Sequence, residues 1–332
     1  MSKVVNFYKA GCADVLKIEK ESIKLPCEGE VRIAISAIGL NRFEIMFRED
    51  NYVISPKFPS RLGGEAVGIV EAIGSNTHGF EVGDRVAVLA TIPMSTSGVY
   101  AEKANIPVTS IVKSINNSTD IDEAALWLAY ITAYGPFIEY ENMQQGQSAL
   151  ITAASSSVGL AAIQIVKDRG GIAIATSRTS TKRQALLDAG ADHVIATEEE
   201  DLLTRIQEIT NGSGVNITFD AIGGKLLPAV AQATAVGGKI YEYGFLDSGG
   251  VSGSKVDLPI IMLYAKMLGF YSVFEVMLNP QRMGRAEAWL RDAVKRGAIK
   301  PKIDKTFPLD DIVAAHRYME SGQQFGKIIV LP

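Results

Sequence analysis

Between residues 148 and 244 the sequence alternates short apolar runs with segments of helical length, and this alternation constrains the fold more than any other feature. Five runs are typical of buried strands: SALITA, GIAIAT, HVIAT, VNITFDAIG and GGKIYEYG. Right-handed helical crossovers between such strands produce a doubly wound parallel sheet. We therefore expect a Rossmann-type α/β domain in this part of the chain.

The turn after the first of these strands reads AASSSVG, residues 153–159. Of the three glycines of a dinucleotide-binding turn only the third is present, as Gly159, while Ala154 and Ser156 stand at the first two positions. Small residues still permit close approach of a phosphate, and a helix N-terminus supplies oriented N–H groups. We expect the cofactor pyrophosphate to bind at Ser155, Ser156, Ser157 and Val158. The alternative is a serine-rich helix cap without a ligand.

The second strand ends in the segment SRTSTKR, where an NAD-specific protein usually carries an acid for the ribose 2′-hydroxyl. This segment holds Ser177, Arg178 and Lys182 and no carboxylate. Guanidinium and ammonium groups bind phosphate oxygens, which predicts NADPH in preference to NADH. The alternative is a set of solvated charges at the start of a surface helix.

Ligands of open α/β sheets bind outside the carboxyl ends of the strands. Tyr243 and Gly244 stand at that end of the strand KIYEYG. We expect both to contact the cofactor.

The first 105 residues are short β-rich runs separated by glycines, which is typical of a compact β domain. After residue 274 a helix at 281–296, a strand, a helix at 309–321 and a closing strand are too few for another domain. We expect them to complete the N-terminal domain. The predicted division is residues 1–123 completed by 275–332, and residues 124–274 for the cofactor-binding domain.

Residues 59–86 carry a long pattern of glycines and charges: Gly63, Gly64, Glu65, Gly68, Val70, Gly74, Gly83, Asp84, Arg85 and Val86. This spacing resembles the signature of the medium-chain dehydrogenase/reductase superfamily. Together with GLNRFEIMFRE, WLAYITAYGPF, FDAIGG and GKIIVLP, the resemblance covers essentially the whole chain and is closest to the quinone oxidoreductase branch. It implies a GroES-like β-barrel catalytic domain beside the Rossmann domain.

The resemblance also assigns candidate site residues. It places Asn41 beside the nicotinamide and Tyr52 in the acceptor pocket, and it puts Thr132 at the nicotinamide end of the cofactor cleft. Many relatives have a tyrosine where this chain has Met46, so one possible hydrogen-bond donor is missing. An ordinary half-buried loop tyrosine is the alternative for Tyr52.

No metal site is expected. Zinc-dependent relatives carry a histidine where this chain has Gly64, and two cysteines with three histidines form no ligand set. The acceptor must then be activated by hydrogen bonding and positioning.

The resemblance implies hydride transfer from NADPH to a quinone or an α,β-unsaturated carbonyl. Sequence does not separate this activity from reduction of an enoyl thioester. A non-catalytic NADPH-binding relative, structural or RNA-binding, is the alternative from another class. With 33 basic against 37 acidic residues the net charge is −4, which disfavours nucleic acid and anionic membranes as partners.

Two cysteines and no secretion signal indicate the cytoplasm. The longest apolar stretch, residues 258–274, contains Lys266 and is short for a membrane span. An apolar strand at a sheet edge is an aggregation hazard unless it is paired. We therefore expect this stretch to form an edge strand that pairs two copies into a homodimer, and an internal strand of the sheet is the alternative.

Overall fold

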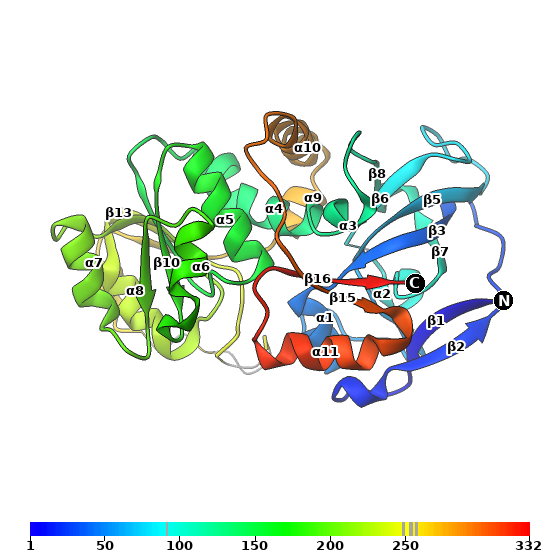
Figure 1. Ribbon diagram of the computed structural model, residues 1–332, viewed down its shortest axis with the longest axis horizontal. Helices are drawn as coiled ribbons and strands as arrows, with labels where there is room; N and C mark the ends of the chain where they lie inside the picture. The colour runs from blue at the N-terminus through cyan, green and yellow to red at the C-terminus, as the bar shows by residue number, and fades with distance from the viewer. Residues whose placement is uncertain (91, 248–249, 252–254, 256–257) are drawn as a thin grey trace. The chain divides into compact units, whose positions relative to one another are not determined.

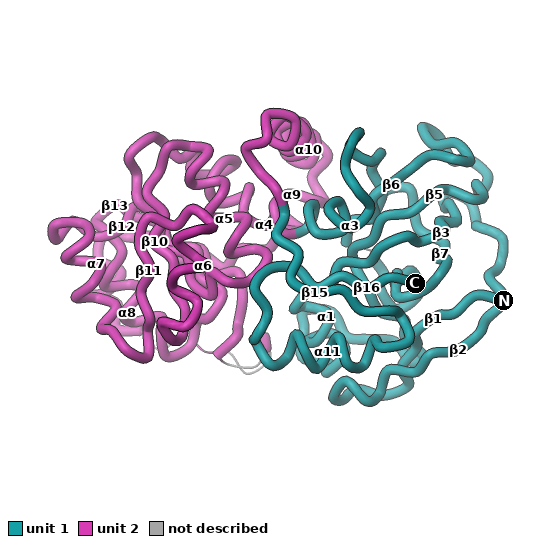
Figure 2. Tube along the Cα trace, in the orientation of Figure 1, with its two compact units in different colours: residues 1–128, 301–332 teal, residues 129–300 magenta. Residues whose placement is uncertain are grey.

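The computed structural model divides the chain into two compact units, which Figure 2 colours separately. Unit 1 comprises residues 1–128 and 301–332, and unit 2 comprises residues 129–300. The structure describes residues 1–90, 92–247, 250–251, 255 and 258–332. The N-terminal unit is thus discontinuous in sequence and holds both ends of the chain (Figure 1).

Unit 2 is built on a parallel six-stranded sheet with the order β11-β10-β9-β12-β13-β14. Its strands are β9 (Ser148–Ile151), β10 (Ile172–Ser177), β11 (His193–Ala196), β12 (Val215–Asp220), β13 (Thr234–Glu242) and β14 (Met267–Phe270). This order reverses between β9 and β12, which is the topological switch of a Rossmann sheet and confirms the predicted fold class.

Helices connect and flank these strands. In chain order they are α4 (Trp127–Tyr134), η3 (Gly135–Tyr140), α5 (Ser157–Asp168), η4 (Ser180–Lys182), α6 (Arg183–Asp188), α7 (Leu202–Thr210), η5 (Gly224–Leu226), α8 (Leu227–Ala233), η6 (Ile260–Leu263), α9 (Phe274–Met277) and α10 (Pro280–Lys295). The sequence predicts a helix from residue 199, whereas α7 begins at Leu202. The reason is a cap: the carboxylate of Asp201 accepts a hydrogen bond from the Thr204 N–H at 2.8 Å.

Unit 1 is mainly β structure. A seven-stranded sheet contains β15 (Ile303–Pro308), β16 (Lys327–Leu331), β3 (Glu30–Gly39), β5 (Glu65–Ile73), β6 (Arg85–Leu89) and β8 (Ile111–Lys113), with β7 (Lys103–Pro107) also paired to β3. A three-stranded sheet contains β2 (Lys17–Glu21), β1 (Ser2–Phe7) and β4 (Ser60–Arg61). The helical segments are η1 (Ala13–Val15), α1 (Arg42–Arg48), α2 (Met94–Ser97), η2 (Val108–Ser110), α3 (Asp120–Glu123), η7 (Leu309–Asp311) and α11 (Ile312–Ser321). One apolar core draws on the first 111 residues and on residues after 308.

The division between the units differs from the sequence-based one at both ends. The chain returns to unit 1 after Lys300 rather than after residue 274. Helix α10 stays with unit 2 because Trp289 packs on Tyr134 with ring centroids 5.7 Å apart, and Arg285 forms an ion pair with Glu139. Such long-range pairs cannot be recognised from helical periodicity.

Among the described residues, no helix is both long enough and apolar enough to cross a membrane. Strand β14, from the apolar stretch at 258–274, lies at the edge of the sheet as predicted.

Candidate functional site

The turn between β9 and α5 is closed by a serine helix cap and a tightly packed glycine. Ser156 is the N-cap of α5, and its hydroxyl accepts a hydrogen bond from the Gly159 N–H at 3.0 Å. A Cβ on Gly159 would lie 2.6 Å from the Cα of Ala154, so only glycine permits this packing of helix against strand. The four predicted residues, Ser155 to Val158, are half-buried and line the first turn of α5. Its free N–H groups and helix dipole favour an anion.

Lys182 lies against this turn, since its ammonium donates to the Ser155 hydroxyl at 3.2 Å. The structure thereby brings together two residues that sequence assigned to different parts of the cofactor. Ser177 ends β10 and donates to the Thr179 carbonyl at 2.8 Å. Arg178 follows it with an exposed side chain.

A carboxylate also lies at this corner, which the sequence segment SRTSTKR does not contain. The Ser180 N–H donates to Glu199 at 3.0 Å, and this bond lowers the pKa of Glu199. Glu199 follows β11, which pairs in parallel with β10 through Ser177 and Ala196. Residues after neighbouring parallel strands meet at one sheet edge, and that rule is the signal that could have located Glu199.

The end of β13 faces the same turn. The ring of Tyr243 stacks on Phe219 with ring centroids 3.9 Å apart, and its buried hydroxyl lies beside Ser156. A Cβ on Gly244 would lie 2.7 Å from the Ala221 carbonyl oxygen, so the loops after β12 and β13 approach closely there.

Glu242, the last residue of β13, is a buried acid that sequence did not identify. Within the described part of the chain neither of its carboxylate oxygens has a hydrogen-bond partner. Burial, and then the charge of Asp220, raise the pKa of Glu242 to about 10. The group is therefore a neutral carboxylic acid at neutral pH.

In unit 1, Asn41 caps α1 and is 8% exposed. Its side-chain amide donates to the Gly39 carbonyl at 2.9 Å and to Glu65 at 3.2 Å, and its oxygen accepts from Lys327 at 2.7 Å. Both amide hydrogens are thus committed to buried neighbours. What remains for a ligand is one acceptor position on the oxygen.

Glu65 and Lys327 form a buried ion pair with an O–N distance of 2.6 Å, and each side chain is 1% exposed. The second Glu65 oxygen accepts from the Leu128 N–H at 2.8 Å, at the start of α4. Both residues lie in segments that resemble the superfamily, yet sequence assigned neither a role. Two oppositely charged residues 262 positions apart give no local signal of pairing.

Tyr52 is half-buried, and its ring lies 5.6 Å from that of Phe43. Burial raises the pKa of Tyr52 to about 12, which keeps the phenol protonated. Met46 is half-buried on α1. Thr132 lies on α4 in unit 2 and is 8% exposed.

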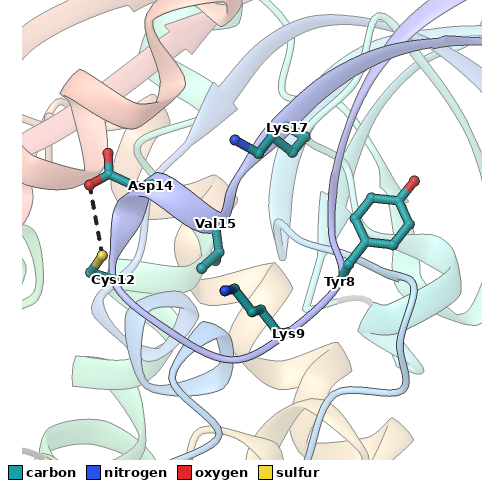
Figure 3. Close-up of a pocket in the computed structure, with 6 residues that line it drawn as sticks. All are labelled: Tyr8, Lys9, Cys12, Asp14, Val15 and Lys17. Carbon is teal, nitrogen blue, oxygen red and sulfur yellow. Dashed lines mark hydrogen bonds between the residues drawn. The ribbon is translucent and has the colours of Figure 1, made fainter.

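Gly64 stands where zinc-dependent relatives carry histidine, and a Cβ there would lie 2.7 Å from the Cζ atom of Phe43. The described residues contain no group of three or more histidine, cysteine, aspartate or glutamate side chains that could hold a metal. The surface hollow in Figure 3 is lined by Tyr8, Lys9, Cys12, Asp14, Val15 and Lys17. None of these is a predicted site residue.

The family models that match the chain are the alcohol dehydrogenase GroES-like domain, over residues 27–116, and the zinc-binding dehydrogenase domain, over residues 189–330. Quinone oxidoreductase 1 of Escherichia coli is 29% identical over the full length of both chains. The 2-haloacrylate reductase of a Burkholderia species is 27% identical over 98% of this chain and 97% of its own.

Among solved structures, the Escherichia coli quinone oxidoreductase complexed with NADPH superposes with a TM-score of 0.91 at 27% identity, covering 99% of this chain and all of the other. These matches span both units and confirm the predicted GroES-like and Rossmann domains. The chain belongs to the medium-chain dehydrogenase/reductase superfamily, with the quinone oxidoreductases among its relatives.

Proposed function

We propose that the protein transfers hydride from NADPH to a quinone or to an α,β-unsaturated carbonyl compound. The observation that carries the proposal is the turn before α5, where the Ser156 cap, the tightly packed Gly159 and the Lys182 ammonium beside Ser155 are suited to bind an anion. Full-length similarity to a quinone oxidoreductase crystallised with NADPH supports the cofactor, and similarity to a 2-haloacrylate reductase supports an activated alkene as acceptor.

The residues at the β-strand ends of unit 2 fit a phosphorylated dinucleotide. Ser155, Ser156, Ser157 and Val158 would hold the pyrophosphate through helix N–H groups and hydroxyls. Lys182 adds a positive charge beside Ser155, and Arg178 with Ser177 would bind the ribose 2′-phosphate. Tyr243, Gly244 and Thr132 would contact the rest of the cofactor.

NADPH supplies a hydride when bound, and the chain must polarise the acceptor. Tyr52 is suited to donate a hydrogen bond to the acceptor oxygen, because its pKa of about 12 keeps the hydroxyl protonated. Asn41 is suited to a different task. Its amide hydrogens are occupied, so it would accept from a ligand and fix the position of the reacting groups rather than donate to them.

We propose that the reaction needs no zinc. Gly64 has no side chain that could hold a metal, a Cβ there would lie 2.7 Å from the Phe43 Cζ atom, and the Gly64 N–H is bonded to Glu44 at 2.8 Å. Without a Lewis acid, simple alcohols lack the polarisation that their oxidation requires. Stoichiometric zinc in protein purified without chelators would contradict this proposal.

We also propose a homodimer formed through β14. Its strand residues Met267 and Phe270 are more than half exposed, as are Ile260, Ile261 and Tyr264 before it. An apolar edge strand of this kind is stabilised when it pairs with its two-fold mate. Light scattering at micromolar concentration should give twice the chain mass of 35.7 kDa.

The exposed thiols of Cys12 and Cys27 fit our proposal of a reducing, cytoplasmic location.

The test of function has two parts. NADPH fluorescence should change on titration with the protein, with a dissociation constant in the micromolar range. The complex should then reduce members of a panel of 1,4-naphthoquinone, 2-haloacrylate and simple enones, and should not oxidise ethanol. NADPH binding without reduction of any acceptor would instead favour a non-catalytic NADPH-binding relative. Absence of NADPH binding, or oxidation of alcohols without quinone or enone turnover, would exclude the proposed reaction.

A further inference from the structure

A chain of buried polar side chains runs through unit 1 behind Asn41. Glu44 is bonded to the hydroxyl of Tyr100 at 2.6 Å, Tyr100 to His316 Nε2 at 3.0 Å, and His316 Nδ1 to the Arg48 guanidinium at 2.9 Å. None of the four side chains is more than 1% exposed. They come from α1, the segment before β7, and α11, so tertiary folding alone assembles them.

The direction of every proton in this chain follows from Arg48. A guanidinium only donates, so His316 Nδ1 must be the acceptor and the neutral ring carries its proton on Nε2. Nε2 therefore donates to the Tyr100 oxygen, and the single proton of Tyr100 is left for Glu44.

Glu44 receives donors on both carboxylate oxygens. One oxygen accepts from Tyr100 and from the Asn41 N–H at 2.7 Å, and the other accepts from the Gly64 N–H at 2.8 Å. A proton on either oxygen would face one of these donors. The arrangement thus favours the ionised form of Glu44, and that form holds the backbone at Asn41 and Gly64.

We propose that Tyr100 and His316 are positioning residues that keep Glu44 ionised and thereby hold Asn41 and Gly64 in place. Naming Asn41 as a site residue rests on the function proposed above. Arg48 anchors the far end, where it pairs with Glu320 at 2.6 Å and with Glu49 at 2.7 Å.

The hydrogen-bonded series from Glu44 to Arg48 is not a route for protons to the acceptor. Glu44 meets only donors that are fixed in the fold, and an arginine does not release its proton at accessible pH. His316 is equally unsuited to carry a proton, because burial and then the charge of Arg48 lower its pKa to about 3. Positioning is the role left by this geometry.

The charges that act on the chain are few. Lys327 acts on Glu44, and Arg48 acts on Tyr100 and His316. Arg42 lies near Glu49 and Glu320, the two partners of Arg48. Burial raises the pKa of Glu44 to about 7, while the bonds from Tyr100, Asn41 and Gly64 oppose that rise.

The decisive variant is Tyr100→Phe, which removes one donor from Glu44. For NADPH-dependent reduction of 1,4-naphthoquinone, kcat/KM of the wild type should fall below about pH 7. In Tyr100→Phe this fall should move to higher pH by about one unit, the size expected when a carboxylate loses a charged hydrogen bond, with recovery at alkaline pH. Tyr318→Phe is the matched control, since the Tyr318 hydroxyl is bonded to Asp304 and to none of the four residues from Glu44 to Arg48 in the hydrogen-bonded series.

His316→Gln separates positioning from proton transfer. A glutamine amide can accept from Arg48 and donate to Tyr100, so this variant should keep the wild-type pH profile. An equal loss of kcat/KM at all pH values in Tyr100→Phe, or loss of activity in His316→Gln, would overturn the proposal.

Unfolding by urea gives a readout that does not depend on activity. The folded-state pKa of Glu44 lies above its unfolded value, so this group's contribution to stability falls as pH rises from about 4.5 to about 7. In Tyr100→Phe the fall should extend to higher pH. If it does so while no acceptor is reduced, the positioning network stands and only the proposed function fails; an unchanged profile overturns the network itself.

Discussion

The two units place their candidate residues by opposite means. In unit 2, all candidates except Thr132 lie at or shortly after the carboxyl ends of β9, β10 and β13, and a parallel sheet brings those strand ends to one edge. In unit 1, the groups around Asn41 come from positions as distant as 44, 65, 100, 316 and 327, and burial brings them together. In unit 2 each candidate is positioned by its own strand, whereas in unit 1 each candidate depends on several buried side chains from distant parts of the sequence.

This difference predicts how each unit responds to mutation. Loss of one side chain at the open edge of a sheet removes a contact with the cofactor and leaves the fold intact. Loss of one side chain in a buried network leaves its partner charged or unpaired, so the fold itself is destabilised.

The largest expected effect is in unit 1. Lys327→Met should lower the free energy of unfolding by about 3–5 kcal/mol, because Glu65 would remain buried without its partner. Urea unfolding checks this value. The matched control is Lys3→Met, which breaks the exposed pair with Asp310 and should cost less than about 1 kcal/mol. Similar losses of unfolding free energy in Lys327→Met and Lys3→Met would show that the buried network of unit 1 does not stabilise the fold more than an exposed ion pair does.

The edge of unit 2 should instead respond in cofactor binding. Arg178→Ala should weaken NADPH by about ten- to hundred-fold and leave NADH nearly unchanged, because only NADPH has the 2′-phosphate. Lys182→Ala should weaken both cofactors, since Lys182 lies beside Ser155 at the pyrophosphate turn. Fluorescence titrations of each variant with NADPH and NADH measure this.

A surface cation elsewhere in unit 2 provides the control, and Lys295→Ala at the end of α10 should leave both dissociation constants unchanged. Equal affinity of the wild type for NADPH and NADH would show that this corner does not recognise the 2′-phosphate. Glu199, which is bonded to Ser180, would then account for the equal affinities, because its negative charge would repel the 2′-phosphate of NADPH.

Glu242 is an exception to this difference between the units, because it is a buried acid in unit 2 whose carboxylate oxygens have no hydrogen-bond partner among the described residues. Its folded-state pKa of about 10 exceeds its unfolded value, so its contribution to stability falls as pH rises above about 4.5. Glu242→Gln, which cannot ionise, should therefore stabilise the protein at pH 8 by about 1–3 kcal/mol, and less at pH 5.

Asp220→Asn should have the opposite sign. Asp220 accepts hydrogen bonds from Thr152 and from the N–H groups of Ile222 and Gly223, and an amide nitrogen cannot accept them. Unfolding curves at pH 5 and pH 8 for both variants test this pair. Destabilisation by Glu242→Gln at pH 8 would mean that the carboxyl group has a partner in solution.

The difference between the two units also explains which parts of the fold and of the candidate site the sequence predicts. Strand-helix alternation predicts the sheet of unit 2, and the glycine at 159 predicts its turn, because both signals are local. The role of Glu44 was missed, although an acid three residues after Asn41 is a capping-box pattern. Its bonds to Tyr100 and Gly64 depend on tertiary folding.

Two further misses have the same cause. Nothing in the sequence indicates that Trp289 and Arg285 pack on α4 and η3. The sequence therefore predicts the return to unit 1 too early by 26 residues, at 274 instead of 300. Glu199 lies beside Ser180 only because β11 pairs with β10.

The smallest expected effect is at Tyr52, which lies between the two cases. It is half-buried against Phe43 but belongs to no hydrogen-bonded network among the described residues, so Tyr52→Phe should leave stability within about 0.5 kcal/mol of the wild type. If its hydroxyl polarises the acceptor oxygen, loss of one neutral hydrogen bond of about 0.5–1.5 kcal/mol should lower kcat/KM by roughly three- to tenfold. The loss should appear in kcat rather than in KM, because the oxygen gains charge only as hydride arrives. Steady-state kinetics with 1,4-naphthoquinone measure both constants, and Tyr8→Phe, an exposed tyrosine bonded to Glu19 in the same unit, serves as control. A rise in KM with unchanged kcat would make Tyr52 a wall of the acceptor pocket and not a donor to the reacting oxygen.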